Sequence, residues 1–156
     1  MPTDTYRLIA QTQAAYARTI DDDRLEEWPD FFADPCSYRI TSADNHREGL
    51  QGGVVYCASH GMLRDRISAL REANIYEQHG YRHILGAPFI VAERGERVDS
   101  ETPFLVARIM RTGETSVFAT GRYLDTYRVS NGKALIESRV VVCDSSRVDT
   151  LLVIPL

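Results

Sequence analysis

The sequence has few cysteines and no long hydrophobic run. Its three cysteines, Cys36, Cys57 and Cys143, are odd in number and far apart, which does not fit a disulfide framework. No apolar run reaches the roughly 20 residues that a membrane-spanning helix needs. The start, Met1-Pro2-Thr3-Asp4, offers neither a basic nor an apolar segment, so no signal peptide is predicted. These features predict a cytoplasmic protein with reduced, buried cysteines.

Positive charge is also in short supply. The formal net charge is −4, and nucleic acids and anionic membranes attract basic surfaces, so neither is expected as a partner. What is present is ordinary: 44% hydrophobic and 26% charged residues, the composition of a globular chain. A chain of 156 residues is long enough for one core, so residues 1–156 are predicted to form a single domain.

Clusters of metal ligands are missing as well. A Rieske iron–sulfur cluster needs two close Cys–His pairs, and only Cys57 and His60 lie within three residues of each other. His79 and His83 have a helical spacing, but their segment reads as a loop entering a strand, where they lie about 13 Å apart and cannot share an ion. No Asp or Glu accompanies them with the local spacing of a mononuclear iron site. No metal ligand or cofactor-binding residue is therefore predicted from local spacing, although folding can still bring distant ligands together.

The first half of the chain is predicted to be mainly helical. Residues 6–20 repeat apolar positions on one face, and a second, short helix follows that one of Asp21–Asp23 caps. Pro29 predicts a kink or break in that second helix. A third helix is predicted at 59–73 with Ser59 as its cap. The predicted inward-facing residues of the three helices are Ile9, Tyr16, Ile20, Leu25, Trp28, Phe31, Phe32, Leu63, Ile67 and Leu70.

The second half changes to strand patterns. After the turn signal Asp34-Pro35 a short strand is predicted at 36–41, followed by a polar loop at 44–53. Four long strands are predicted at 81–92, 102–111, 115–128 and 134–143, joined by turns at 93–100, 112–114 and 130–133. Asn131-Gly132 is a strong hairpin signal. Together these elements predict an α+β fold, a cone in which N-terminal helices pack on a long, curved antiparallel sheet.

A pocket enzyme on such a cone would need an acid and a base. The candidates are Tyr38, Tyr56, His60, Asp125 and Arg139. The competing interpretation is structural: the tyrosines belong to the core, and Asp125 pairs with Arg139 across the turn at Asn131-Gly132. The structural interpretation is the favoured one.

Several charged residues stand among apolar strand residues. Such residues either form a solvated face or engage carboxylates across a subunit interface. The candidates for an interface are His79, Arg82, His83, Arg122, Asp125 and Arg139.

Four segments resemble the beta subunits of ring-hydroxylating dioxygenases. They are 62-MLRDRISALREANIYEQHGYRHILG-86, 28-WPDFF-32, 113-GETSVFATGRYLDTY-127 and 139-RVVVCDSSRVDTLLVIPL-156. The resemblance covers nearly the whole chain. It implies a cone-shaped fold similar to nuclear transport factor 2 and the cystatins, and a small subunit without catalytic residues of its own.

The resemblance also implies a partner and a reaction. Such beta subunits assemble with a large alpha subunit, usually three of each, and the alpha subunit holds the Rieske [2Fe-2S] cluster and the mononuclear Fe(II). A reductase feeds electrons to the complex through the alpha subunit. The implied activity is NAD(P)H- and O2-dependent cis-dihydroxylation of an aromatic carboxylate such as terephthalate.

Two rival functions stay open at this point. A stand-alone dehydratase or isomerase on the same cone would need an open pocket with converging acid and base. A ligand-binding module would need a pocket that Trp28, Phe31, Phe104 and Phe118 do not fill.

Overall fold

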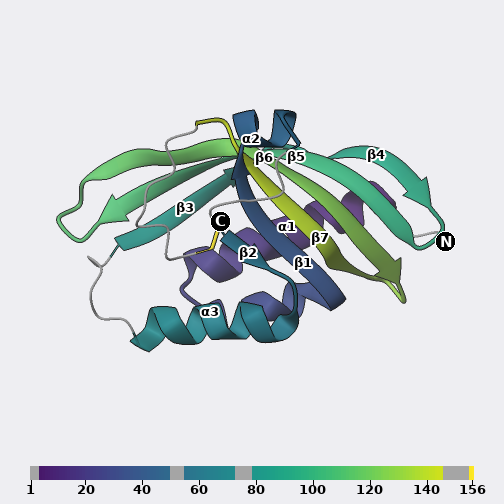
Figure 1. Cartoon of the computed structure of the whole chain (residues 1–156), viewed down its shortest axis with the longest axis horizontal. Coiled ribbons are helices and arrows are strands. Elements are labelled where there is room, and N and C mark those ends of the chain that lie inside the picture. The colour runs from purple at the N-terminus through teal and green to yellow at the C-terminus, as the bar shows by residue number, and fades with distance from the viewer. Residues whose placement is uncertain (1–3, 50–54, 73–78, 146–154) are drawn as a thin grey trace.

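A curved sheet of seven strands arches over two long helices, α1 and α3 (Figure 1). The computed structural model describes residues 4–49, 55–72, 79–145 and 155–156. The helical elements are α1 (Thr5–Asp21), the 3-10 helix η1 (Leu25–Phe31), α2 (Ala43–Arg47) and α3 (His60–Glu72). The strands are β1 (Phe32–Ser42), β2 (Val55–Cys57), β3 (His79–Leu85), β4 (Phe89–Arg94), β5 (Arg97–Met110), β6 (Thr115–Ser130) and β7 (Lys133–Cys143).

The strand order is β2-β1-β7-β6-β5-β3. The edge of β5 that does not face β6 pairs first with β4 and then, further along, with β3. Every pair is antiparallel except β1 and β7, which run parallel from Ser37 opposite Ser138 to Ser42 opposite Cys143. The predicted fold class is confirmed, because helices pack on one side of a curved sheet. The sheet is mixed rather than wholly antiparallel, since the hairpin signals in the sequence reveal only neighbours along the chain.

The first helix begins where the sequence predicts. The carboxylate of Asp4 accepts a weak hydrogen bond of 3.4 Å from the backbone N–H of Arg7, which caps the first turn. Its buried residues recur at helical spacing and include Ile9, Gln13 and Tyr16, so one face of α1 lies against the sheet. None of the helices in the described ranges is long and apolar enough to cross a bilayer.

The two following helices differ in how well the sequence predicted their caps. The expected aspartate cap of the second helix is wrong, because Arg24 precedes η1 and no side chain caps it. Pro29 lies inside this short helix, which takes the tighter 3-10 form. In α3 the predicted cap is confirmed: the hydroxyl of Ser59 accepts a hydrogen bond from the N–H of Met62 at 3.2 Å. Residue 73, the predicted end of this helix, lies outside the described residues.

The strand around residue 36 is longer than predicted. It begins at Phe32, so Phe32 belongs to β1 rather than to the second helix, and Asp34-Pro35 lies inside the strand where its pairing with β7 shifts. The predicted loop at 44–53 contains the short helix α2, and residues 50–54 lie outside the described part of the chain.

The single strand predicted at 81–92 is two strands, β3 and β4. The break falls at residues 86–88, where Gly86 donates a backbone hydrogen bond of 2.8 Å to Pro103 and Pro88 has no N–H to offer a neighbouring strand. The predicted loop at 93–100 is instead a tight hairpin around Gly95, whose φ is +64°. Strand β5 therefore starts at Arg97 and pairs first with β4, then with β3.

The other two turns are confirmed. Asn131 and Gly132 have φ values of +53° and +74°, the backbone that a two-residue hairpin between β6 and β7 requires. Gly113, with φ +93°, makes the turn between β5 and β6. These hairpins place β5, β6 and β7 side by side, and the core lies between their inner faces and the helices α1, η1 and α3.

Candidate functional site

The most elaborate polar cluster of the described residues lies in the core, between α1 and the inner face of the sheet. Asp125 on β6 stands directly opposite Arg139 on β7, and both side chains are fully buried. Arg139 donates from Nε to Asp125 Oδ1 at 2.8 Å and from Nη2 to Asp125 Oδ2 at 2.9 Å. Gln13 on α1 donates to the same carboxylate at 3.1 Å and accepts from Arg139 Nη2 at 2.9 Å. The predicted ion pair is confirmed, with Gln13 as a third member that the sequence did not indicate.

Two aromatic rings, edge to face with each other, flank the charged end of Arg139. Its guanidinium carbon lies 4.3 Å from the ring centre of Tyr16 and 4.0 Å from that of Tyr123. Burial alone would lower the pKa of Arg139, but Asp125 together with Tyr127 and Tyr16 more than offsets this, and the pKa is raised well above its usual value. The cation is therefore permanent, and its carboxylate partner is saturated with donors. This arrangement stabilises a structure and offers no free base.

The acid–base candidates do not converge on a common space. Tyr38 is buried and forms hydrogen bonds with the backbone of Leu156. Tyr56 lies half exposed on β2. The Nε2 atom of His60 lies 2.8 Å and 3.0 Å from two backbone carbonyl oxygens of β1, so it donates and is not available as a base. The four aromatic residues named as a test of an open pocket, Trp28, Phe31, Phe104 and Phe118, all belong to the core or pack against it. The pocket enzyme and the open binding module both lose support.

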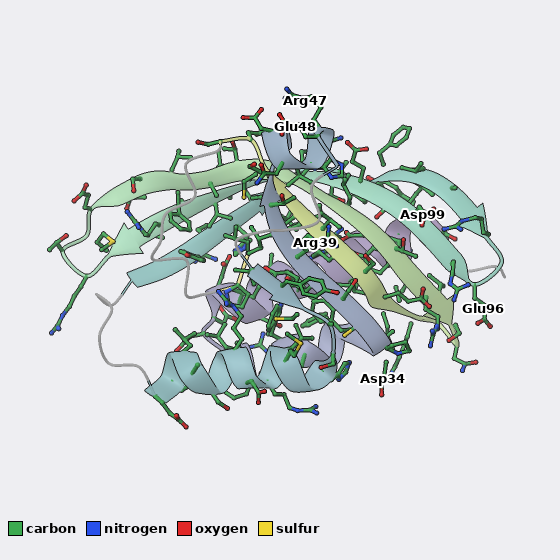
Figure 2. All side chains as sticks on the ribbon, in the orientation of Figure 1. Asp34, Arg39, Arg47, Glu48, Glu96 and Asp99 are labelled. Carbon is green, nitrogen blue, oxygen red and sulfur yellow. The ribbon has the colours of Figure 1, made fainter. Side chains whose placement is uncertain are left out.

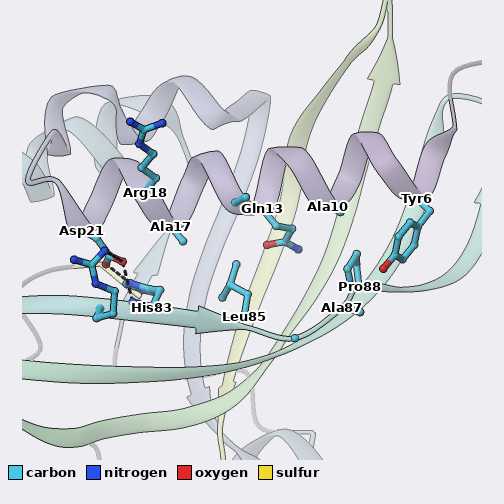
Figure 3. A pocket seen from close by; sticks show the side chains of 13 residues that line it. Tyr6, Ala10, Gln13, Ala17, Arg18, Asp21, His83, Leu85, Ala87 and Pro88 are labelled. Atoms are coloured by element: carbon cyan, nitrogen blue, oxygen red, sulfur yellow. Dashed lines mark hydrogen bonds and ion pairs between the residues drawn. The ribbon is translucent and has the colours of Figure 1, made fainter.

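A groove does lie between α1 and the end of β3 (Figure 3). Its volume is about 460 Å³, and small side chains such as Ala10 and Ala17 line the helix side. At one end His83 Nδ1 donates to Asp21 Oδ1 at 2.7 Å, while the backbone N–H of His83 donates to Asp21 Oδ2 at 2.9 Å. This pair is buried and ties the end of α1 to β3. Asp21 was expected only as a helix cap, because no local pattern shows that it meets a residue 62 positions away.

Five of the six interface candidates divide into a buried group and an exposed group. Asp125, Arg139 and His83 lie inside the chain, where their side chains contact this chain's own residues. Arg82 and Arg122 are exposed, and Arg122 pairs with Glu101 at 2.6 Å. For His79 only its backbone pairing, opposite Met110 on β5, is described. Of the candidates whose side chains the structure describes, Arg82 and Arg122 are therefore the ones that remain exposed for contact with another chain.

Large apolar side chains also reach solvent from the outer side of the sheet. Phe89 on β4 is 69% exposed and Val117 on β6 is 64% exposed, and Val91 on β4 and Ile84 on β3 are exposed as well. Ile84 stands opposite Leu105 and Val117 opposite Ala107, on the face that turns away from α1. Charged side chains, Asp99 and Glu96 among them, lie towards the tip of the β4–β5 hairpin (Figure 2). The apolar residues read as ordinary strand positions, so the sequence alone did not separate them from the core.

The described residues do not fit a metal cofactor. Within them no group of three or more His, Cys, Asp or Glu side chains is placed to hold a metal ion. The three cysteines are buried thiols, and burial raises the pKa of Cys143 to about 11. An iron–sulfur cluster needs thiolates and imidazoles gathered at one place, which this arrangement does not provide.

The fold matches a known family of domains. Residues 2–140 match the family model described as the SnoaL-like domain. A solved structure assigned to the beta subunit of an aromatic-ring-hydroxylating dioxygenase from Novosphingobium aromaticivorans superimposes with a TM-score of 0.89. It is 38% identical, over 97% of this chain and 96% of that one. The chain is a member of the SnoaL-like class, whose cone matches that of nuclear transport factor 2.

Similar curated proteins show which family within this class the chain belongs to. The chain is 55% identical to beta subunit 1 of the terminal oxygenase component of terephthalate 1,2-dioxygenase from Comamonas sp, over 95% of this chain and 96% of the relative. It is 40% identical to the small subunit of anthranilate 1,2-dioxygenase from Burkholderia cepacia, over 97% and 94% of the two chains. The chain belongs to the family of beta subunits of aromatic ring-hydroxylating dioxygenases.

Proposed function

We propose that this chain, folded as one domain, is the small subunit of a terminal oxygenase whose large alpha subunit performs the chemistry. The observation that carries the proposal is the 55% identity to a terephthalate dioxygenase beta subunit over nearly the full length of both chains. The geometry supports it, because the buried Asp125 carboxylate is occupied by donors from Arg139 and Gln13 and the described residues offer no ligand set for iron. The Rieske cluster and the mononuclear iron then belong to the alpha subunit, and the reductase delivers its electrons there.

The substrate we propose is an aromatic carboxylate, with terephthalate first. The support is that the relative at 55% identity is a terephthalate dioxygenase subunit, whereas the anthranilate relative stands at 40%. The alpha subunit holds the reacting ring and catalyses the NAD(P)H- and O2-dependent cis-dihydroxylation, and this chain supports the assembly, with three copies of each subunit. The cytoplasm is the proposed location.

We propose the outer face of the sheet as the contact with the alpha subunit. Four exposed apolar residues, Ile84, Phe89, Val91 and Val117, gather on β3, β4 and β6 around β5. Arg82 stands in register with Ala107 and Val117, and Arg122 lies beside them opposite Pro103. The arginines are thus interleaved with the exposed apolar residues, and protein interfaces are enriched in aromatic residues and arginine. Arg82 and Arg122 are the interface candidates that this face retains.

The test is co-expression with an alpha subunit of the terephthalate dioxygenase type. The expected result is a complex that elutes with three copies of each chain and carries iron in proportion to the alpha subunit. With its reductase and NAD(P)H, the complex is expected to convert terephthalate to the cis-dihydrodiol. This chain purified alone is expected to bind no stoichiometric iron and to turn over no substrate. Stoichiometric iron in the isolated chain, or failure to associate with the alpha subunit, would contradict the proposal.

A further inference from the structure

The groove between α1 and the residues that connect β3 to β4 is long and narrow (Figure 3). Tyr6 lines one end and Asp21 the other, so the groove follows α1 for on the order of 22 Å. Its volume of about 460 Å³ is therefore spread along the helix. This shape fits an extended polypeptide of about six or seven residues better than it fits one compact small molecule.

The walls of the groove are mostly apolar. Ala10, Ala14 and Ala17 line the helix side, and their spacing places them on one face of α1, where their small side chains leave room for an occupant. Residues 85–88 form the other side, where the chain has left β3 and has not yet entered β4. Ala14 and Ala87 are exposed, so an occupant would remove apolar surface from water along both walls.

Two arginines at one end of the groove keep hydrogen-bond donors to offer. Nε of Arg18 lies 3.7 Å from a carboxylate oxygen of Asp22, and Nη1 of Arg82 lies 3.9 Å from one of Asp21, both longer than a hydrogen bond. Both oxygens of Asp21 already accept from His83, at 2.7 and 2.9 Å. Neither guanidinium makes a hydrogen bond to a described residue. A carboxylate from another molecule would thus meet donors of the kind that arginine offers in pairs.

The groove borders the exposed apolar residues on the outer face of the sheet. Ile84 and Phe89 are 58% and 69% exposed, and they directly flank the groove wall at residues 85–88. Arg82 connects the two surfaces, because it pairs with Ala107 in the sheet while its side chain reaches the groove. A partner that covers the outer face can therefore continue over β3 and β4 into the groove.

We propose that an extended segment of the alpha subunit lies in this groove and places an Asp or Glu carboxylate between Arg18 and Arg82. The inference rests on the proposed function, because it takes the alpha subunit as the partner and the outer face as the adjoining contact. Apolar side chains of the segment pack on Ala10, Ala14 and Leu85, and the carboxylate fixes the register of the segment along α1. The alpha subunit then holds the β3–β4 edge of the sheet from two sides.

The first test fills the groove and measures binding to immobilised alpha subunit. Ala14→Trp puts an indole where the segment would lie, and Ala14 is exposed, so the fold is retained. The affinity is expected to fall at least tenfold. Gln11→Trp is the matched control, because Gln11 is exposed on the same helix and does not line the groove, and it is expected to bind normally. Both variants are expected to melt within about 2 °C of the unmodified chain.

A second pair of variants tests the carboxylate. Arg18→Gln removes a cation of the groove and is expected to weaken the affinity about threefold to tenfold and to make it less dependent on salt. Arg7→Gln removes an exposed cation of the same helix that does not line the groove, and it is expected to leave the affinity and its salt dependence unchanged.

The outcomes separate this inference from the proposed function. If the unmodified chain does not bind the alpha subunit, the proposed function fails and the groove contact falls with it. If Ala14→Trp binds as well as the unmodified chain while Val117→Asp binds poorly, the outer-face contact stands and the groove contact alone is overturned.

Two further results would assign the groove to a different occupant and overturn the inference as well. One is a saturable thermal shift of the isolated chain with terephthalate that Ala14→Trp abolishes, which would indicate a small acid. The other is a dimer of the isolated chain that Ala14→Trp dissociates, which would indicate a second copy of this chain.

Discussion

Asp125 and Arg139 face each other across the β6–β7 hairpin, joined by two hydrogen bonds of 2.8 and 2.9 Å in a fully buried ion pair. Arg139→Met is expected to destabilise the chain by about 3–5 kcal/mol, because it leaves a carboxylate buried without its cation. The measurement is equilibrium unfolding in urea. The double variant Asp125→Leu/Arg139→Met is expected to recover much of the loss, since neither charge then stays unpaired.

The matched control is the exposed pair Arg122–Glu101. Arg122→Met is expected to cost less than about 1 kcal/mol, because solvent screens an exposed pair. A cost for Arg139→Met no larger than that for Arg122→Met would show that the buried pair does not hold the fold together.

Gly121 is a position where the close approach of β6 and β7 leaves no room for a side chain. It is buried on β6 opposite Cys143, and a Cβ there would collide with the backbone carbonyl of Val142 and lie 3.0 Å from the Cα of Cys143. Gly121→Ala is expected to lower the free energy of unfolding by about 1–3 kcal/mol or more, because β6 and β7 must move apart. Gly80→Ala on β3, where nothing lies within 4 Å, is the control and is expected to be near neutral. Similar unfolding midpoints for both variants would contradict this account.

The ion pairs of Glu137 are expected to stabilise the folded chain at neutral pH but not in acid. Burial alone would raise its pKa, but hydrogen bonds from Arg97 at 3.0 Å and Arg128 at 2.8 Å outweigh burial and hold the pKa below the ordinary 4.5. A carboxyl whose pKa is lowered by folding stabilises the folded state above its unfolded pKa, and this contribution is lost as the pH falls through the folded pKa. Glu137→Gln is therefore expected to be less stable than the unmodified chain at pH 7.

The difference between the two proteins is expected to shrink as the pH is lowered below 4.5, the ordinary value for a glutamate. This stability difference is measured by thermal melts of both proteins at pH values between about 3 and 7, roughly one pH unit apart. Glu114→Gln, in the exposed turn before β6, is the control and is expected to change nothing. A gap between Glu137→Gln and the unmodified chain that stays constant over this range would refute the linkage.

If the outer face of the sheet contacts the alpha subunit, a charge placed on that face is expected to weaken assembly with the alpha subunit without unfolding this chain. Val117→Asp places a charge in the exposed apolar set on the outer face, so co-purification with the alpha subunit is expected to fall at least tenfold. The fold of the isolated chain is expected to be unchanged, because Val117 is mostly exposed. Tyr56→Asp, on β2 at the opposite end of the sheet order, is the matched control and is expected to assemble normally. Normal assembly of Val117→Asp would exclude this face.

What the sequence predicts well is local. Ser59 caps α3, Asn131-Gly132 turns the β6–β7 hairpin, and Asp125 meets Arg139 because that hairpin sets their register. Each of these follows from a turn or a period that can be read within a short stretch of chain.

What the sequence does not predict depends on contacts between distant segments. No local pattern indicates that Asp21 binds His83, that Gln13 enters the Asp125–Arg139 pair, or that Leu156 lies among Tyr16 and Tyr38. Burial also decides which charged strand residues stay available to a partner. His83, Asp125 and Arg139 resemble Arg82 and Arg122 in the sequence, and only the folded sheet separates inner from outer positions.

The parallel neighbours β1 and β7 join positions 37–42 to positions 138–143. During synthesis β1 therefore acquires the strand that covers one of its two edges only after residues 138–143 have left the ribosome. A nascent chain that stalls earlier carries β1 with that edge open, and open strand edges recruit other chains. Productive assembly with another polypeptide is in this way restricted to molecules in which β7 has already been made and has paired with β1.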